Sequence, residues 1–269
     1  MLQQRLSSIS IDPDRALLEW LQALGGRISG RLLASSGTFQ YFAAAAPGAK
    51  ELVSMVKIWE LTQGRRWQRR AAGYDLVVLD APATGNALGM LGSPQTFGAI
   101  ARVGPVAGQA QHVRELLEDP ERTAYVAVAL ASEMAVTEVL ELQDGLRRLL
   151  GRTLSAVIFN GLLPQRFTAS ELRRIASVNA NGDPLGEDPA GERRPLSSRT
   201  SRLATAESAL RRSAAMAARA VHERARLQHN QVARLRRRSF EVLGVPFVWD
   251  AHVDLPAIER VAAQLGRRL

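Results

Sequence analysis

Residues 74–91 read YDLVVLDAPATGNALGML, and this stretch decides the fold. Tyr74–Asp80 is a short, continuous run of valine and leucine, which is typical of a strand buried on both faces of a parallel sheet. Asp80 ends the run, and Thr84-Gly85 follow at once. Because ligands bind outside the carboxyl ends of parallel strands, these residues form a first candidate site. Asp80 can hold Mg²⁺ there, or it can cap the following turn, and the residues alone leave both interpretations open.

Three further runs predict strands at Tyr125–Leu130, Ala156–Asn160 and Val245–Trp249. Helical segments separate them, at 112–117, 137–150, 169–177 and from about 205 to 238. Alternation of strands and helices favours an α/β fold with a doubly wound parallel sheet. The sheet core is expected at about 74–165 and 240–269.

The first third of the chain predicts a helical subdomain over about 13–70. Asp12 is an N-cap residue type, Pro13 suits a helix start, and Ala16, Trp20 and Leu21 share one helical face. Near the other end, Asn179–Arg199 is rich in Gly, Pro, Ser and charge, and is expected to be a mobile surface loop. All these parts are interpreted as one domain, 1–269.

Composition excludes several classes of site. The chain has no cysteine, so disulfides and thiolate metal sites are absent, and the four histidines are too scattered for zinc. No run of about eighteen uncharged apolar residues predicts a membrane-spanning helix. The formal charge is +9, which permits contact with nucleic acid or an anionic membrane. The arginine-rich helix at about 205–238 has few interleaved aromatics, however, so a solvated face is favoured over nucleic-acid binding.

Two further candidate sites lie at or near the ends of predicted strands. Asn160 ends AVIFN, and its amide offers a donor and an acceptor that match the edge of adenine, although Asn before Gly is also an ordinary turn signal. Pro246 and Phe247 lie in the last run, where they can form an apolar wall beside a base or simply part of a core strand. Taken singly, the structural interpretation is favoured at both places.

Together these segments resemble the ArsA-like anion-transporting ATPases, which include the targeting factors for tail-anchored membrane proteins. LDAPATGNAL is similar to the family's switch-II segment, and the likeness continues through VTEVLELQDGLRRLLGR, AVIFNGLLPQRFT and VPFVWDAHVDLPAIERVAAQL. Upstream, SISIDPDRALLEWL resembles the segment after the family's second strand. The resemblance covers nearly the whole chain and implies a P-loop NTPase-like sheet with an inserted helical subdomain.

The resemblance also implies roles for individual residues. Asp80 would be the acid on the Mg²⁺ side, Thr84 and Gly85 would belong to the switch that senses the terminal phosphate, and Asn160 would read adenine. Pro246 and Phe247 would lie in the loop beside the base. Glu133 matches a family glutamate that precedes a helix, and its role stays open. The family commonly has histidine at the position of Asn86. A switch function that depends on the imidazole ring is therefore not expected here.

The chain departs from the family in its phosphate-binding parts. No G-x-x-x-x-G-K run occurs, so the P-loop and its strand are missing, and Lys50 and Lys57, both in a predicted helix, cannot replace its lysines. The switch-I segment with its catalytic aspartate is missing too, so no catalytic residue is assigned. We therefore expect an N-terminally truncated form of a longer gene product, poorly soluble alone because neighbouring strands lack a partner.

These features lead to ranked functional hypotheses. The first is an ArsA-like ATPase that uses ATP and Mg²⁺ to handle a client or partner in the cytoplasm, with this chain inactive alone. A second ATPase subunit or a homodimer is the expected partner, and residues 87–108 offer a hydrophobic client surface, although internal packing of that stretch is favoured. Arsenite capture and a zinc clasp between subunits are disfavoured, because both need cysteine. The alternatives are a P-loop-less partner subunit of a complete ATPase and, ranked last, a nucleic-acid binder.

Overall fold

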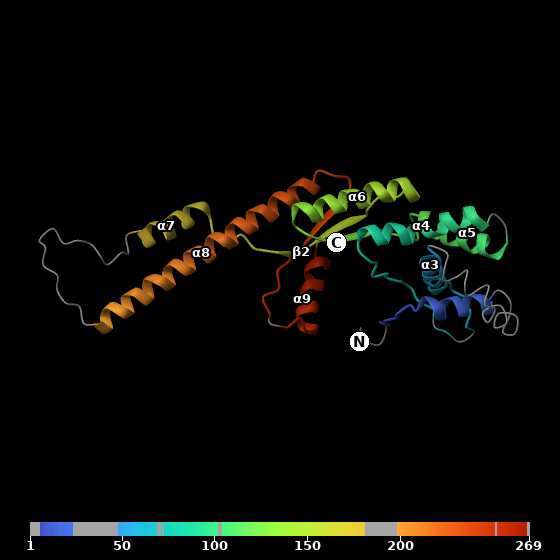
Figure 1. Cartoon of the computed structure of the whole chain (residues 1–269), viewed down its shortest axis with the longest axis horizontal. Helices are drawn as coiled ribbons and strands as arrows, with labels where there is room; N and C mark the ends of the chain where they lie inside the picture. Colours follow the sequence, from blue (N-terminus) through green and yellow to red (C-terminus); the bar gives the residue numbers. More distant parts are fainter. Residues whose placement is uncertain are drawn as a thin grey trace, which may run out of the picture. The chain divides into compact units, whose positions relative to one another are not determined.

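The computed structural model describes residues 6–23, 48–68, 71, 73–101, 104–180, 198–250 and 252–267. The chain divides into two compact units. The first comprises Met1–Tyr125 and Glu138–Leu154, and the second comprises Val126–Thr137 and Ser155–Leu269. Figure 1 shows the elements of both in sequence colours.

The first unit is helical in its described part. It holds a helix over 13–23, then α3 (Ala49–Leu61), α4 (Thr84–Ala101) and α5 (Pro105–Glu118), together with α6 (Glu133–Leu150) from residue 138 onward. The carboxylate of Asp12 accepts hydrogen bonds from the N–H groups of Asp14 and Arg15 at 2.9 and 3.0 Å, so Asp12 is the predicted N-cap. The predicted face of this helix is buried: Ala16, Trp20 and Leu21.

Helices α3, α4 and α5 pack against one another and form the core of the first unit. Val56 of α3 and Val113 of α5 are fully buried, and Phe97 of α4 is 5% exposed. Helix α4 also approaches α6 closely. A Cβ atom placed on Gly145 would lie 2.5 Å from a terminal methyl carbon of Leu88, so only glycine fits this contact without a shift.

The second unit contains a small parallel sheet. Its described strands are β1 (Val126–Leu130), β2 (Ala156–Leu162) and β3 (Glu241–Pro246), in the order β1-β2-β3. The helices are the start of α6, α7 (Ala169–Ala180), α8 (Ser198–Leu235) and α9 (Leu255–Gly266). Val157 and Phe159 of the central strand are fully buried, and α8 contributes Val232 and Leu235 to the core. The predicted strands at 125–130 and 156–160 are confirmed.

Two strand predictions were wrong. Tyr74–Asp80 is not a strand but an extended, largely exposed segment in which Leu76 and Val78 are 79% and 82% exposed. A strand needs a neighbour for its backbone hydrogen bonds, and the described part of the first unit contains no other strand. The last strand is Glu241–Pro246 rather than 245–249. It begins where the N–H of Glu241 donates to the carbonyl of Ser155 and ends at a proline, which has no N–H to donate.

The architecture is therefore mixed α/β with a small parallel sheet. This agrees with the predicted α/β class, whereas the three described strands do not establish the predicted doubly wound arrangement. Residues 181–197 of the predicted loop lie outside the described residues, while Asn179 belongs to α7 and Ser198 and Arg199 to α8. Residues 24–47 of the predicted helical subdomain also lie outside them. Among the helices that the structure describes, none has an apolar stretch long enough to cross a bilayer.

Strand β1 forms one edge of the described sheet and exposes apolar side chains. Val126, Val128 and Leu130 are 52%, 67% and 62% exposed, whereas the intervening Ala127 is buried. Residues two apart on a strand share one face, so this exposure belongs to a single face of β1. An apolar strand face beside an unpaired edge is a ready surface for another polypeptide.

Candidate functional site

The switch-like segment lies in the first unit. After the exposed residue Asp80, the chain runs through Pro82 into α4, whose first residues are Thr84 and Gly85. The N–H of Ala87 donates to the carbonyl of Ala83 at 3.0 Å, which closes the first turn of α4. The N–H groups of a first helical turn have no partner within the helix, so this turn offers backbone donors to an anion.

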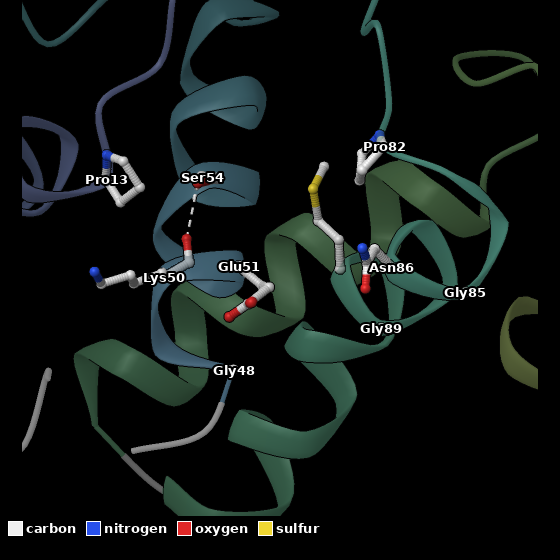
Figure 2. Close-up of a pocket in the computed structure, with 10 residues that line it drawn as sticks. Pro13, Gly48, Lys50, Glu51, Ser54, Pro82, Gly85, Asn86 and Gly89 are labelled. Atoms are coloured by element: carbon white, nitrogen blue, oxygen red, sulfur yellow. Dashed lines mark hydrogen bonds between the residues drawn. The ribbon is translucent and has the colours of Figure 1, made fainter. Parts of the chain in front are cut away.

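A pocket of about 600 Å³ opens beside this first turn, within the first unit (Figure 2). Glu51 of α3 lies on the side of the pocket that faces Asn86 of α4, while the side chain of Lys50 extends toward Pro13. A Cβ atom on Gly85 or Gly89 would meet nothing within 4 Å, so α4 presents bare backbone there. The pocket is lined by Pro13, Gly48, Lys50, Glu51, Ser54, Pro82, Gly85, Asn86, Gly89 and Met90.

The two lysines of the chain have different environments, and neither resembles a P-loop lysine. Lys50 is exposed in the first turn of α3. Lys57 binds two carboxylates: its Nζ lies 2.6 Å from Glu19 and 2.9 Å from Glu60. The second of these carboxylates also accepts from Arg66 Nε at 2.6 Å and from the N–H of Trp67 at 3.0 Å. Lys57 is thus part of a charge network within the helical core.

This network sets the ionisation of Glu60, which is 1% exposed. Burial by itself raises the pKa of its carboxyl group, but the hydrogen bonds from Arg66, Lys57 and the Trp67 N–H together lower the pKa below its ordinary value of 4.5. Glu60 is therefore an anion at neutral pH, and it neutralises buried cations rather than facing a ligand. We assign the network to the stability of the helical unit.

The base-side residues lie in the second unit, at the carboxyl edge of the sheet. Asn160 pairs in register with Leu130, and an irregularity follows in β2, where Gly161 has φ of 72°. The N–H of Phe247 donates to the carbonyl of Leu162 at 2.9 Å, and Leu162 lies opposite Pro246. The ends of β2 and β3 thus place Asn160, Pro246 and Phe247 at the same edge of the sheet.

Three residues that the sequence did not single out complete this edge. Gln228 of α8 accepts from the N–H of Leu163 at 2.8 Å and donates to the carbonyl of Gly161 at 3.2 Å, so it fixes the bend after Asn160. Trp249 lies edge-on to Phe247 with ring centroids 4.7 Å apart, and the guanidinium of Arg166 lies 5.2 Å from the Trp249 ring. In the sequence VPFVWD the aromatic residues are two apart, and this alternation could have indicated Trp249 as a neighbour of Phe247.

The exposure of these rings decides what the edge can do. Phe247 is 44% exposed and Trp249 is 56% exposed, so both present ring surface to solvent. A planar heteroaromatic ring can stack on such a surface, and a neighbouring amide can hydrogen-bond to its edge. This edge therefore presents both an amide group, that of Asn160, and aromatic ring surface to solvent.

Glu133 is the first residue of α6 and lies three residues after the end of β1, at the same edge of the sheet. Ser132 caps the helix: its Oγ accepts from the N–H of Ala135 at 3.3 Å, and its carbonyl accepts from the N–H of Val136 at 3.0 Å. Glu133 thus lies in the first turn of a helix rather than before it. Its side chain is exposed.

The residues present fit ATP only in part. The edge of the second unit suits the base, but the sequence has no P-loop to surround the phosphates. Asp80 and the first turn of α4 belong to the first unit, whereas Asn160, Pro246 and Phe247 belong to the second. Within the described residues no three His, Asp or Glu side chains gather at metal-binding distance. A Mg²⁺ ion would bind mainly through phosphates and one or two carboxylates, of which Asp80 could supply one.

Together these features define a mixed α/β protein with a small parallel sheet whose carboxyl edge carries an amide and exposed aromatic rings. The sequence model of the family described as anion-transporting ATPase matches residues 1–104. The ATPase BagA of Mycobacterium tuberculosis is 29% identical over 182 residues, which are 66% of this chain and 52% of that protein. The arsenical pump-driving ATPase of Escherichia coli is 30% identical over 136 residues, or 44% and 22% of the two chains.

A further relative is the arsenical pump-driving ATPase of Acidiphilium multivorum, which is 26% identical over 132 residues. The chain is thus similar to ArsA-like ATPases over these stretches, which confirms the resemblance stated from its sequence. It spans about half the length of the mycobacterial relative that it matches.

Proposed function

We propose that this chain supplies the base-binding side and the switch segment of an ArsA-like ATPase that couples ATP hydrolysis to handling a protein partner in the cytoplasm. By itself it does not hydrolyse ATP, because it carries no P-loop to position and neutralise the phosphates. The observation that carries the proposal is the convergence of Asn160, Pro246 and Phe247 at the carboxyl edge of the sheet.

Within this proposal the residues divide the work. Asn160 hydrogen-bonds the edge of adenine, and Phe247 packs beside the ring. In the first unit, the resemblance assigns the sensing of the terminal phosphate to Thr84 and Gly85 and the binding of Mg²⁺ to Asp80. Without a P-loop the phosphates lack their main contacts, so nucleotide affinity is expected to be weak and governed by the base.

Equilibrium dialysis with radiolabelled ATP and adenosine tests this division. ATP and adenosine should bind with similar dissociation constants, and inorganic tripolyphosphate should not compete, because the phosphates make no strong contact. Asn160→Ala should weaken adenosine binding about tenfold, the equivalent of one good hydrogen bond. Asn230→Ala on the exposed side of α8 is the matched control and should leave the affinity for adenosine unchanged.

Three outcomes would contradict the proposal. Competition by tripolyphosphate, or ATP bound far more tightly than adenosine, would mean that a phosphate site exists in these residues. Equal adenosine affinity in the Asn160→Ala variant and the wild type would remove the base site. ATP turnover by the isolated chain above that of an Asp80→Asn variant would overturn its inactivity.

A second candidate is a P-loop-less partner subunit of a complete ATPase. The exposed apolar face of β1 favours it, because Val128 and its neighbours offer a docking surface. The chain should then co-elute with a complete ArsA-like ATPase from the same genome and change its ATP turnover. Val128→Glu should abolish co-elution, whereas Ile258→Glu on α9, which is also half-exposed, should not. Unchanged elution of both proteins on mixing would count against this candidate.

A further inference from the structure

Most of the net positive charge of the chain lies in one segment. Residues 206–238, which form the greater part of α8 and the turn after it, contain nine arginines and two glutamates, giving a formal +7 out of the total of +9. All nine arginines are exposed, and within the described part of the chain one of them, Arg211, forms an ion pair, with Glu207. The segment therefore presents a dense cationic surface to solvent.

Three of these arginines form a row along α8. Arg212, Arg219 and Arg226 are seven residues apart, which is close to two helical turns, so they lie on one side of the helix at intervals of roughly 10 Å. Arg is suited to phosphate groups, because its planar guanidinium donates two hydrogen bonds at once. A row of this kind fits a surface that carries many phosphates.

Apolar side chains border the arginine row and are equally exposed. Met216 is 67% exposed and lies four residues after Arg212 and three before Arg219, so it neighbours both on the helix surface. Leu227, eleven residues further on, falls on almost the same side and is 58% exposed. Leu210 is 71% exposed. Exposed apolar groups beside arginines make this part of α8 amphipathic on its outer surface.

These apolar groups are not used by the fold of the second unit. Helix α8 packs through a different set of residues, among them the buried Ala225, Val232 and Leu235, and α7 runs alongside it (Figure 1). Burying the outer apolar side chains would gain free energy from the hydrophobic effect. A nucleic-acid duplex would use the arginines but would leave Met216 and Leu227 in water, whereas a bilayer interface accepts both kinds of group.

We propose that residues 206–238 bind the surface of a bilayer rich in anionic phospholipid. The row of Arg212, Arg219 and Arg226 contacts the headgroup phosphates, and Met216 and Leu227 enter the boundary between headgroups and acyl chains. The charge of the segment is complementary to such a surface, and α8 lies on it without crossing it. This binding goes beyond the proposed ATPase role.

Flotation of the purified full chain with vesicles tests the proposal. At low salt the chain should float with vesicles of 70% phosphatidylcholine and 30% phosphatidylglycerol, and not with pure phosphatidylcholine. Replacing the row in R212Q/R219Q/R226Q should lower the partition coefficient about a hundredfold, because each arginine near an anionic surface contributes about a factor of five. Glutamine is a good helix former, and circular dichroism checks that α8 persists.

The matched control is R122Q/R147Q/R148Q, which removes three exposed arginines of the first unit and the same net charge. It should change the partition coefficient less than threefold. M216S/L227S tests the apolar part: it should abolish the binding that survives 0.5 M salt and spare much of the binding at low salt. Equal losses in the two arginine triples, or no effect of M216S/L227S, would overturn the proposal. Tighter binding to duplex DNA than to anionic vesicles would overturn it in favour of a nucleic-acid surface.

Discussion

The side-chain amide of Gln228 donates to the carbonyl oxygen of Gly161 across 3.2 Å, and this bond ties α8 to the end of the central strand. The same side chain accepts from the N–H of Leu163 at 2.8 Å. One glutamine therefore satisfies two backbone groups at an irregular bend, where no neighbouring strand can do so.

Gln228→Ala should destabilise the protein by about 1–3 kcal/mol, because it leaves a backbone donor and an acceptor without partners in a half-buried place. Urea unfolding monitored by circular dichroism measures this loss. Asn230→Ala, two residues away on the exposed side of α8, serves as the control. It should change the free energy of unfolding by less than about 0.5 kcal/mol. Equal effects of the two variants would show that the bend does not depend on Gln228.

Glu60→Gln should be the more damaging change, with a loss of about 3–5 kcal/mol, because it removes the anion that Lys57 and Arg66 surround in the core. The exposed Glu141→Gln on α6 is the control. A loss of stability no greater than that of the control would mean that the cations find other partners.

The lowered pKa of Glu60 also predicts a pH dependence. The folded protein favours the ionised form, so the contribution of this group is complete above the ordinary pKa of 4.5 and disappears as the pH falls through the lower folded value. As the pH is lowered below 5, the urea midpoint of the wild type should therefore fall more steeply than that of Glu60→Gln. Parallel curves for the two proteins would exclude this role.

Tyr125 should ionise late in an alkaline titration. Burial raises the pKa of its phenol to about 12, and the hydroxyl donates to the carbonyl of Leu117 at 2.9 Å. The difference in ultraviolet absorbance between the wild type and Tyr125→Phe isolates this group, and its midpoint should lie near 12 rather than 10. Because the folded pKa is raised, the stabilisation persists up to pH 10 and is lost as the pH rises toward 12. A midpoint near 10 would place the phenol in solvent.

Gly145→Val should destabilise the first unit by about 1–3 kcal/mol, because its Cβ would come within 2.5 Å of a methyl carbon of Leu88. The double variant Gly145→Val with Leu88→Ala removes the clash and should recover part of the loss. Gly89→Val, on the same helix as Leu88 but with open space around it, is the control for changing glycine in a helix. Thermal unfolding of the four proteins would show whether this contact limits the packing of α4 on α6.

The strands show where sequence reasoning succeeds and where it stops. Tyr125–Leu130 and Ala156–Asn160 were predicted from runs of apolar residues, and both are strands because each has a neighbour in the sheet. Tyr74–Asp80 has the same pattern and no such neighbour, so its residues stay extended and exposed. Composition reports which side chains suit a strand, but pairing depends on segments that are distant in sequence.

The candidate base site shows a similar division. Parallel strands end at one edge, so the convergence of Asn160 with Pro246 and Phe247 could be anticipated from their positions after two strands. The bond from Gln228 could not, because it joins residues 67 positions apart. The contact of Arg166 with Trp249 likewise depends on the tertiary fold.

Helix α8 is 38 residues long, roughly 57 Å at 1.5 Å per residue, and Gln228 lies near its C-terminal end. The arginine row occupies the preceding turns of the same unbroken rod. A rod transmits axial displacement with little loss, so a pull of a few ångströms on the row has to move Gln228 and strain the bend after Asn160. Whatever engages the outer part of α8 therefore acts mechanically on the edge proposed to read adenine, without touching it.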